Sequence, residues 1–330
     1  MLTQIARRLF AGLLTMLVVG IVAFGIFRYL GDPVVSMAGL EATQAERDVM
    51  RAQLGLDDSQ FVQFGRFMGN ALRGEFGISY HSARSVSSLI AERLPATLEL
   101  VFVASALSLS LGIALGVYTG LNANTMASRI ILTLSLVGIS LPTFVTGTLL
   151  IYVFAVQLNW LPSFGRGELV QLGWWSSGLF TKTGLQSVIM PAVTLALFQV
   201  TLIQRLTRAE MMEVARADFV RFCRARGLFY RAVYLRHALK NALLPVITIA
   251  GLNIGAVIGF SVVTETIFQW PGMSLLFMDA VRFSDVPVLS AYLILIALIF
   301  TIINVTIDVL YVVIDPRLRV QAQAGAALGS

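Results

Sequence analysis

The stretch LVFVASALSLSLGIALGVYTGLNANTMAS, residues 100–128, contains no Asp, Glu, Lys or Arg. A helix needs roughly 20 consecutive apolar residues to cross the hydrocarbon core of a bilayer, because the core is about 30 Å thick and each residue adds about 1.5 Å. Residues 100–128 exceed that length. The stretch therefore predicts a membrane-spanning helix, and this prediction decides the class of fold.

Five further stretches without charged residues meet the same length requirement: residues 9–27, 130–165, 183–204, 241–264 and 286–307. The composition agrees, since the mean hydropathy is +0.82 and only 13% of residues are charged, against about a quarter in soluble domains. The sequence thus predicts an all-α integral membrane protein with six transmembrane helices. The stretch 130–165 is longer than a span requires, so we expect its helix to end near Leu158, where an Asn-Trp-Leu-Pro turn begins.

Lysine and arginine in short connecting segments indicate the orientation, because they are enriched on the cytoplasmic side. With the N-terminus in the cytoplasm, the cytoplasmic segments hold fourteen of them, whereas the short outer segments hold only Arg166, Lys182 and Arg282. We therefore expect both termini in the cytoplasm. The first apolar run exceeds the roughly 7 to 15 residues of a signal-peptide core, so we interpret it as a retained span rather than a cleaved signal.

The predicted organisation has four parts. Residues 1–30 form the N-terminal cytoplasmic end and the first span, and residues 31–95 form a long extracytoplasmic segment of amphipathic helices. Residues 96–313 form a core of five spans, and residues 314–330 form a cytoplasmic tail.

Two helices are expected within the outer segment, on the surface of the bundle. Thr43-Gln-Ala-Glu46 has the form of a capping box, in which a hydroxyl and a carboxylate accept hydrogen bonds from amides at a helix start. We expect this helix to end at Leu54, before Gly55. A second helix is expected from Ser59 to Gly74. Its predicted apolar face consists of Phe61, Phe64, Phe67, Met68, Ala71 and Leu72.

Known catalytic and nucleotide-binding motifs are not found in the sequence. Cys223 is the only cysteine, and His81 and His237 lie on opposite sides of the predicted membrane, so a disulfide or a shared metal site is not expected. No Gly-x-x-x-x-Gly-Lys phosphate loop, His-Glu-x-x-His or Gly-x-Ser-x-Gly is present. We predict a chain that is not an enzyme, holds no cofactor or metal, and does not bind nucleic acid.

Glu99, Glu265 and Asp308 are acids at the ends of predicted spans. An ionisable group within a membrane suggests a proton relay or an ion site. Because each of these lies at a span end, we expect it to be solvated or to cap a helix. An ion-coupled secondary carrier is an alternative for the chain as a whole, but such a carrier is expected to place ionisable residues at mid-membrane.

Gly251, Gly255 and Gly259 recur at one-turn spacing in the fifth apolar stretch. Small residues at this spacing form a ridge on which a second helix approaches closely. We expect helix packing at these positions, with a smooth wall of a translocation pathway as the alternative.

A basic segment, RADFVRFCRARGLFYRAVYLRHALKNALLP at residues 216–245, holds seven basic side chains against one acid. Helical spacing places Phe219, Phe222 and Cys223 on one face, and Gly227 interrupts the pattern before a second helical stretch at 230–243. The predicted cytoplasmic loop, residues 205–241, thus contains two short amphipathic helices that form a docking surface. Attraction to anionic membrane lipid is the alternative explanation of its charge.

Eight short motifs together resemble one protein family: GDP at 31–33, LGLD at 54–57, NALRGEFGIS at 70–79, ERLPATLEL at 92–100, RARGL at 224–228, RHALKNALLPVIT at 236–248, ETIFQWPG at 265–272 and DPRLR at 315–319. The chain resembles the membrane-spanning permease of ABC importers of the binding-protein-dependent type I class. It is most similar to the B-type permease of the branch that takes up dipeptides, oligopeptides and nickel.

This resemblance implies half of a translocation pathway in the bacterial inner (cytoplasmic) membrane. The implied partners are a second, related permease that completes a heterodimer, two cytoplasmic ATPase subunits that bind ATP and Mg, and a periplasmic substrate-binding protein. Transport by alternating access is implied, with a di- or oligopeptide as substrate. Nickel, glutathione or another small solute is the alternative substrate.

In that family the cytoplasmic loop carries a Glu-Ala-Ala signature with a glycine six residues after the Glu, and its short helix couples to the ATPase. Aligned on the glycine, the signature falls on residues 221–223 of this chain, and Phe222 departs from the Arg-Thr-Ala that is common in the peptide branch. The resemblance implies an ATPase-coupling loop that includes Phe219, Arg221, Phe222, Cys223, Arg224, Gly227, Leu244 and Pro245.

Overall fold

The computed structural model describes residues 2–29, 34, 43–53 and 56–314, and these residues are almost entirely helical. In chain order the elements are α1 (Leu2–Tyr29), α3 (Gln44–Gln53), α4 (Gln60–Leu72), α5 (Val86–Leu121), α6 (Met126–Ser140), α7 (Thr143–Leu150), the π-helix η1 (Ile151–Gln157), β1 (Val170–Leu172), β2 (Trp175–Ser177), α8 (Lys182–Val214), α9 (Asp218–Ala225), the π-helix η2 (Ala232–Ala238), α10 (Leu239–Ile267), α11 (Met273–Arg282) and α12 (Val286–Ile314). The motifs at 31–33 and 315–319, and the predicted helix end at 54–55, lie outside the described residues.

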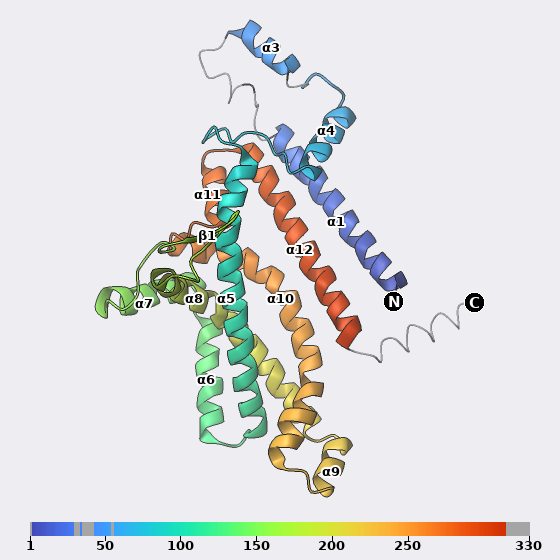
Figure 1. Ribbon diagram of the computed structural model, residues 1–330, viewed down its shortest axis with the longest axis vertical. Helices are drawn as coiled ribbons and strands as arrows, with labels where there is room; N and C mark the ends of the chain where they lie inside the picture. The colour runs from blue at the N-terminus through green and yellow to red at the C-terminus, as the bar shows by residue number, and fades with distance from the viewer. Residues whose placement is uncertain (1, 30–33, 35–42, 54–55, 315–330) are drawn as a thin grey trace, which may run out of the picture.

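Five helical segments are long and apolar enough to cross a membrane: α1, α5, α8, η2 with α10, and α12. A sixth crossing is possible if α6 and the α7–η1 helix count as one broken span. The prediction of an all-α, multispan membrane protein is therefore confirmed. Figure 1 shows α9 at one end of the bundle and α3 and α4 at the other.

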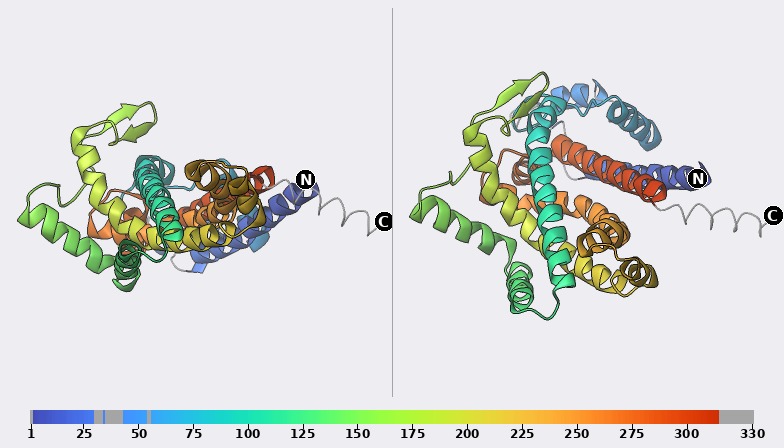
Figure 2. Two further views of the ribbon diagram at one scale, coloured as in Figure 1. Left: turned by 90° about the horizontal axis from the view of Figure 1, so that it is seen from below. Right: turned by 60° about the horizontal axis from the view of Figure 1, so that its bottom comes forward.

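The third predicted span is not one straight helix. It breaks between α6 and α7, and the two halves meet at 107°, so that α7 extends sideways from the bundle (Figure 2). Pro142 explains the break, because proline disfavours helical geometry in the residue before it. Leu141 has the extended values φ −87° and ψ 129°. The expected helix over 130–158 was wrong at this point.

The pair α5 and α8 forms the centre of the fold. Three glycines of α5, at positions 112, 116 and 120, face α8 at one-turn spacing. A Cβ atom at Gly116 would lie 2.5 Å from Cβ of Thr207 and 2.8 Å from the carbonyl oxygen of Gln204. Only glycine allows the two helices to approach so closely, and the sequence analysis did not single out this series.

The glycines that it did single out lie on α10. A Cβ atom at Gly251 would lie 2.9 Å from Cγ1 of Ile307 on α12, and one at Gly255 would overlap the ring of Phe300 on the same helix. At Gly259 no atom lies within 4 Å of the added Cβ. The first two positions therefore contact α12, whereas the third faces open space.

The outer segment contains the two expected helices. The capping box at the start of α3 is confirmed, since the amide of Thr43 donates to Oε2 of Glu46 at 2.8 Å and the amide of Glu46 donates to Oγ1 of Thr43 at 3.4 Å. The backbone hydrogen bond from Thr43 holds the pKa of the Glu46 carboxyl below its usual value.

The second helix, α4, follows Ser59 and ends before Gly74, whose φ is +75°. Its packing face is narrower than predicted. Phe64 and Phe67 contact Phe24 of α1, with ring centroids 5.5 and 5.7 Å apart, but Phe61 and Leu72 are exposed. The buried residue of α4 is Gln63, which accepts a hydrogen bond from Arg28 at 2.8 Å.

We predict that Gly116→Ala destabilises the fold, because the added methyl meets backbone and Cβ atoms that cannot rotate away. Overpacking of this kind costs about 1 to 3 kcal/mol. Thermal unfolding of the detergent-solubilised chain measures the effect, with Gly25→Ala on α1 as the control, because no atom lies within 4 Å of a Cβ at Gly25. Equal unfolding temperatures for the two variants would contradict close α5–α8 packing.

Candidate functional site

The helix α9 forms the tip of the loop that joins α8 to α10 (Figure 1). Its side toward the bundle carries Val220, which is buried in a cluster with Met211 of α8 and Val233 of η2. Cys223 is half-buried and packs against the same cluster. Phe219 and Phe222 are exposed instead. The prediction that Cys223 shares one free face with these two phenylalanines is therefore wrong.

Gly227 turns the chain after α9. Its φ is +76°, in the left-handed region where glycine is favoured, and its amide donates to the carbonyl of Arg224 at 2.9 Å. The three residues that follow are exposed. Together with α9 they complete an apolar patch, which we call the loop surface: Phe219, Phe222, Leu228, Phe229 and Tyr230. Contiguous exposed apolar residues at the end of a bundle indicate contact with a partner.

The basic side chains of α9 surround the loop surface rather than entering the bundle. Arg221 and Arg224 are exposed, and the contact of Arg221 with Asp218, at 3.6 Å, is open to solvent. The guanidinium of Arg226 lies 5.6 Å from the ring centroid of Phe222. These charges can contact a partner or lipid phosphates without a conformational change.

The second predicted loop helix does not exist as a separate element. From Tyr230 the chain runs through η2 into α10 without interruption, and the whole segment Ala232–Ile267 is long enough to span a membrane. Leu244 and Pro245 therefore lie inside a continuous helix and not at a point where the chain re-enters the membrane. The loop surface is attached directly to a transmembrane helix.

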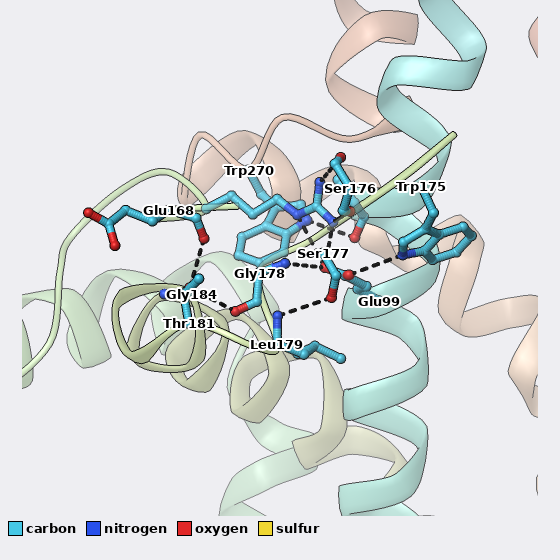
Figure 3. Close-up of polar contacts among 12 residues, drawn as sticks. Glu99, Glu168, Trp175, Ser176, Ser177, Gly178, Leu179, Thr181, Gly184 and Trp270 are labelled. Carbon is cyan, nitrogen blue, oxygen red and sulfur yellow. Dashed lines mark hydrogen bonds and ion pairs between the residues drawn. The ribbon is translucent and has the colours of Figure 1, made fainter. Parts of the chain in front are cut away.

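At the other end of the bundle, a buried ion pair joins α5 to the β1–β2 hairpin (Figure 3). Nε and Nη2 of Arg166 both donate to Oε2 of Glu99, and the side chains are only 3% and 4% exposed. Trp175 donates from Nε1 to Oε1 of Glu99 at 3.3 Å. Arg166 also donates to the carbonyl of Ser176 at 2.6 Å, so both charges have several partners.

Glycines allow the hairpin to pack closely against the start of α8. Gly167 has φ +71°, and a Cβ there would lie 2.7 Å from the amide nitrogen of Gly184. A Cβ on Gly184 would overlap the carbonyl of Gly178. Thr181 caps α8 by accepting a hydrogen bond from the Gly184 amide at 3.0 Å. The ion pair is thus held in a closely packed frame.

A second buried acid, Glu265, fixes the start of α11. Its Oε2 accepts from the amides of Ser274 and Leu275 at 2.9 and 3.4 Å, and its Oε1 accepts from Oγ1 of Thr97 at 2.7 Å. These two amides belong to the first turn of α11, whose free N–H groups attract a negative charge. A Cβ at Gly272 would overlap the Glu265 carboxylate. The motif at 265–272 therefore supplies both the acid and the space that it needs.

A third acid, Asp285, was missed by the sequence analysis. It is buried just before α12 and accepts hydrogen bonds from the hydroxyl of Ser79 and from the amides of Tyr80 and His81. His81 also stacks on Phe283, with ring centroids 3.7 Å apart. The signal was available, because Ser79 ends the NALRGEFGIS motif.

The expectation that the acids at the span ends are solvated is wrong for Glu99 and Glu265, which are both buried. The alternative, that they cap helices, is confirmed for Glu265. The side chain of Asp308 is outside the described part of the structure. Among the described residues, no three His, Cys, Asp or Glu side chains gather as metal ligands.

Comparison with known families gives the chain its place. Residues 112–320 match the family "Binding-protein-dependent transport system inner membrane component", and residues 1–101 match the N-terminal family of the same systems. The chain belongs to this family. It is therefore a multipass protein of the inner membrane and the permease of an ABC importer.

Two kinds of relatives agree with this assignment. The glutathione transport system permease protein GsiC of Escherichia coli K12 is 36% identical over 320 residues, which is 97% of this chain and 99% of the relative. GsiC of Shigella dysenteriae gives the same values. The inward-facing MetNI methionine ABC transporter matches with a TM-score of 0.54 at 15% identity, covering 69% of this chain and 96% of the MetNI chain, and shows a common fold.

We predict that Glu99→Gln or Arg166→Met alone destabilises the permease more than the double variant does. Removal of one partner leaves a buried charge unpaired, at a cost of about 3 to 5 kcal/mol, whereas the double variant leaves none. Thermal unfolding of the four proteins gives a double-mutant cycle. Strictly additive effects would show that the two side chains do not depend on each other.

Proposed function

We propose that this permease forms one half of the pathway of an importer for di- or oligopeptides. The observation that carries the proposal is its 36% identity with glutathione permeases over almost the full length of both chains. Glutathione is itself a short peptide, so it is one of the candidate substrates. Nickel is the other class of substrate considered, and this chain offers two His and one Cys as potential ligands.

The permease is proposed to act with four other proteins: a second permease as heterodimer partner, two ATPase subunits and a periplasmic binding protein. ATP and Mg would be held by the ATPase subunits, since this chain lacks a phosphate-binding loop. The excess of Lys and Arg at 205–240 supports a cytoplasmic position for α9 and for both termini. The proposed domains are residues 1–30, 31–95, 96–313 with the loop 205–241, and 314–330.

The loop surface is proposed to be the contact with one ATPase subunit. Phe219 and Phe222 are exposed, while Val220 anchors the same helix to Met211 and Val233. A helix of this kind can hold a partner on one side and move with the bundle on the other. Closure of the ATPase subunits on ATP would then shift the equilibrium between inward-open and outward-open permease.

An ion-coupled carrier is less well supported. Its ionisable groups are expected at mid-membrane, but Glu99 and Glu265 lie at the hairpin end and accept hydrogen bonds from fixed groups. An acid that is satisfied in this way supports a structural role rather than a proton relay. Gly259, which faces open space, is a candidate for the pathway wall, and Gly251 and Gly255 are proposed for helix packing.

We predict that Phe219→Ala and Gly227→Val uncouple transport from ATP hydrolysis while the permease still inserts. The first removes an apolar contact with the ATPase, and the second strains a residue at φ +76° by about 1 to 2 kcal/mol. Phe10→Ala is the control, because Phe10 is an exposed aromatic on α1. ATP hydrolysis stimulated by loaded binding protein, and uptake into vesicles, are the measurements. Normal coupling in both variants would refute the loop as ATPase contact.

The substrate is tested through the binding protein that copurifies or functions with the permease. We expect mass spectrometry of its bound ligands, and competition binding, to identify short peptides. Retention of glutathione alone would narrow the substrate to that tripeptide. Retention of nickel without peptide would overturn the proposed substrate class but leave the assignment as ABC permease intact.

A further inference from the structure

A groove between α6 and α8 carries two arginines that the transport function does not use. It has a volume of about 470 Å³ and is lined by Leu132 and Leu136 of α6 and by Arg205, Arg208, Ala209 and Met212 of α8. Arg205 and Arg208 are three residues apart, so they project from one face of the helix. The groove therefore combines a pair of cations with an apolar wall.

The charges of this groove lack partners. Nη1 of Arg208 is shielded from solvent and has no hydrogen-bond acceptor within the described ranges. None of the ion pairs formed among the described residues involves Arg205 or Arg208. A buried cationic N–H group without an acceptor is costly, typically by 1 to 3 kcal/mol or more. The arrangement points to an anion that comes from another molecule.

The position along the helix identifies the kind of anion. Arg205 follows the first residue of α8 by 23 positions, which corresponds to about 35 Å at 1.5 Å per residue. The hydrocarbon core is about 30 Å thick, so the arginines lie where lipid headgroups begin. Leu132 and Leu136 lie four residues apart on one face of α6. An apolar wall that leads from a pair of cations into the membrane fits an acyl chain below a phosphate.

We propose that this groove binds an anionic phospholipid, with its phosphate on Arg205 and Arg208 and one acyl chain along Leu132 and Leu136. Basic pockets between transmembrane helices recognise anionic headgroups in this way. A carboxylate of a protein partner would satisfy the guanidinium groups but would leave the apolar wall uncovered. The inference rests on the position of the groove in the membrane and is independent of the proposed substrate.

The test uses the full chain in phosphatidylcholine nanodiscs that contain a small fraction of photoactivatable phosphatidylglycerol. After illumination, mass spectrometry maps the labelled peptides. We expect labelling of peptides from α6 and α8, with roughly tenfold or greater loss in Arg205→Gln/Arg208→Gln, since each arginine near an anionic surface contributes on the order of 1 kcal/mol. Arg231→Gln/Arg236→Gln is the matched control, because it removes two exposed arginines from the same loop and should keep the label.

Two further arms make the result decisive. Leu132→Trp fills the apolar wall while both charges remain, so it should also reduce labelling, even if the arginine variants fold poorly. Equal labelling by photoactivatable phosphatidylcholine, equal loss in the control, or displacement by inorganic phosphate alone would overturn the proposal. Loss of the label when the ATPase subunits assemble would also overturn it and would assign the arginines to a protein contact.

Discussion

Lipid offers no hydrogen bonds, so every polar group of this permease that leaves water must find its partner inside a protein or on another molecule. At the hairpin end, three buried acids meet this requirement. Glu99 fixes the hairpin to α5, Glu265 fixes the start of α11, and Asp285 fixes the turn before α5. Each acid joins segments that are distant in sequence. The arrangement of the outer loops follows from these three contacts.

The helix α8 connects that end of the permease to the loop surface. Its first turn is capped by Thr181 beside the hairpin, and its last turns carry Met211, which packs under Val220 of α9. Between these points the glycines of α5 leave no space between the two helices. Packed interiors resist compression, so α5 and α8 behave as one body. A displacement of α9 is therefore transmitted along the whole unit rather than absorbed locally.

The number of membrane spans could be read from the sequence, because uncharged runs such as residues 100–128 have a single physical explanation in a chain of this composition. The break at Pro142 was harder to predict, since prolines at 191 and 245 lie inside continuous helices. The burial of Glu99 depends on Arg166, which is 67 residues away. Pairings of this kind come from tertiary packing, which periodicity along one helix does not record. The helix α9 and the turn at Gly227 were predictable because both are local.

The π-helix η2 has a geometric consequence for the loop surface. A π-turn contains one residue more per hydrogen-bonded turn than an α-turn, and such segments arise as insertions within α-helices. Each residue of an α-helix advances the direction of its side chains by about 100°. The additional residue in Ala232–Ala238 therefore sets the angle at which Phe229 and Tyr230 face outward from α10. A relative without this insertion would present the same aromatic residues to a different side, so η2 fixes the phase between the membrane helix and its partner.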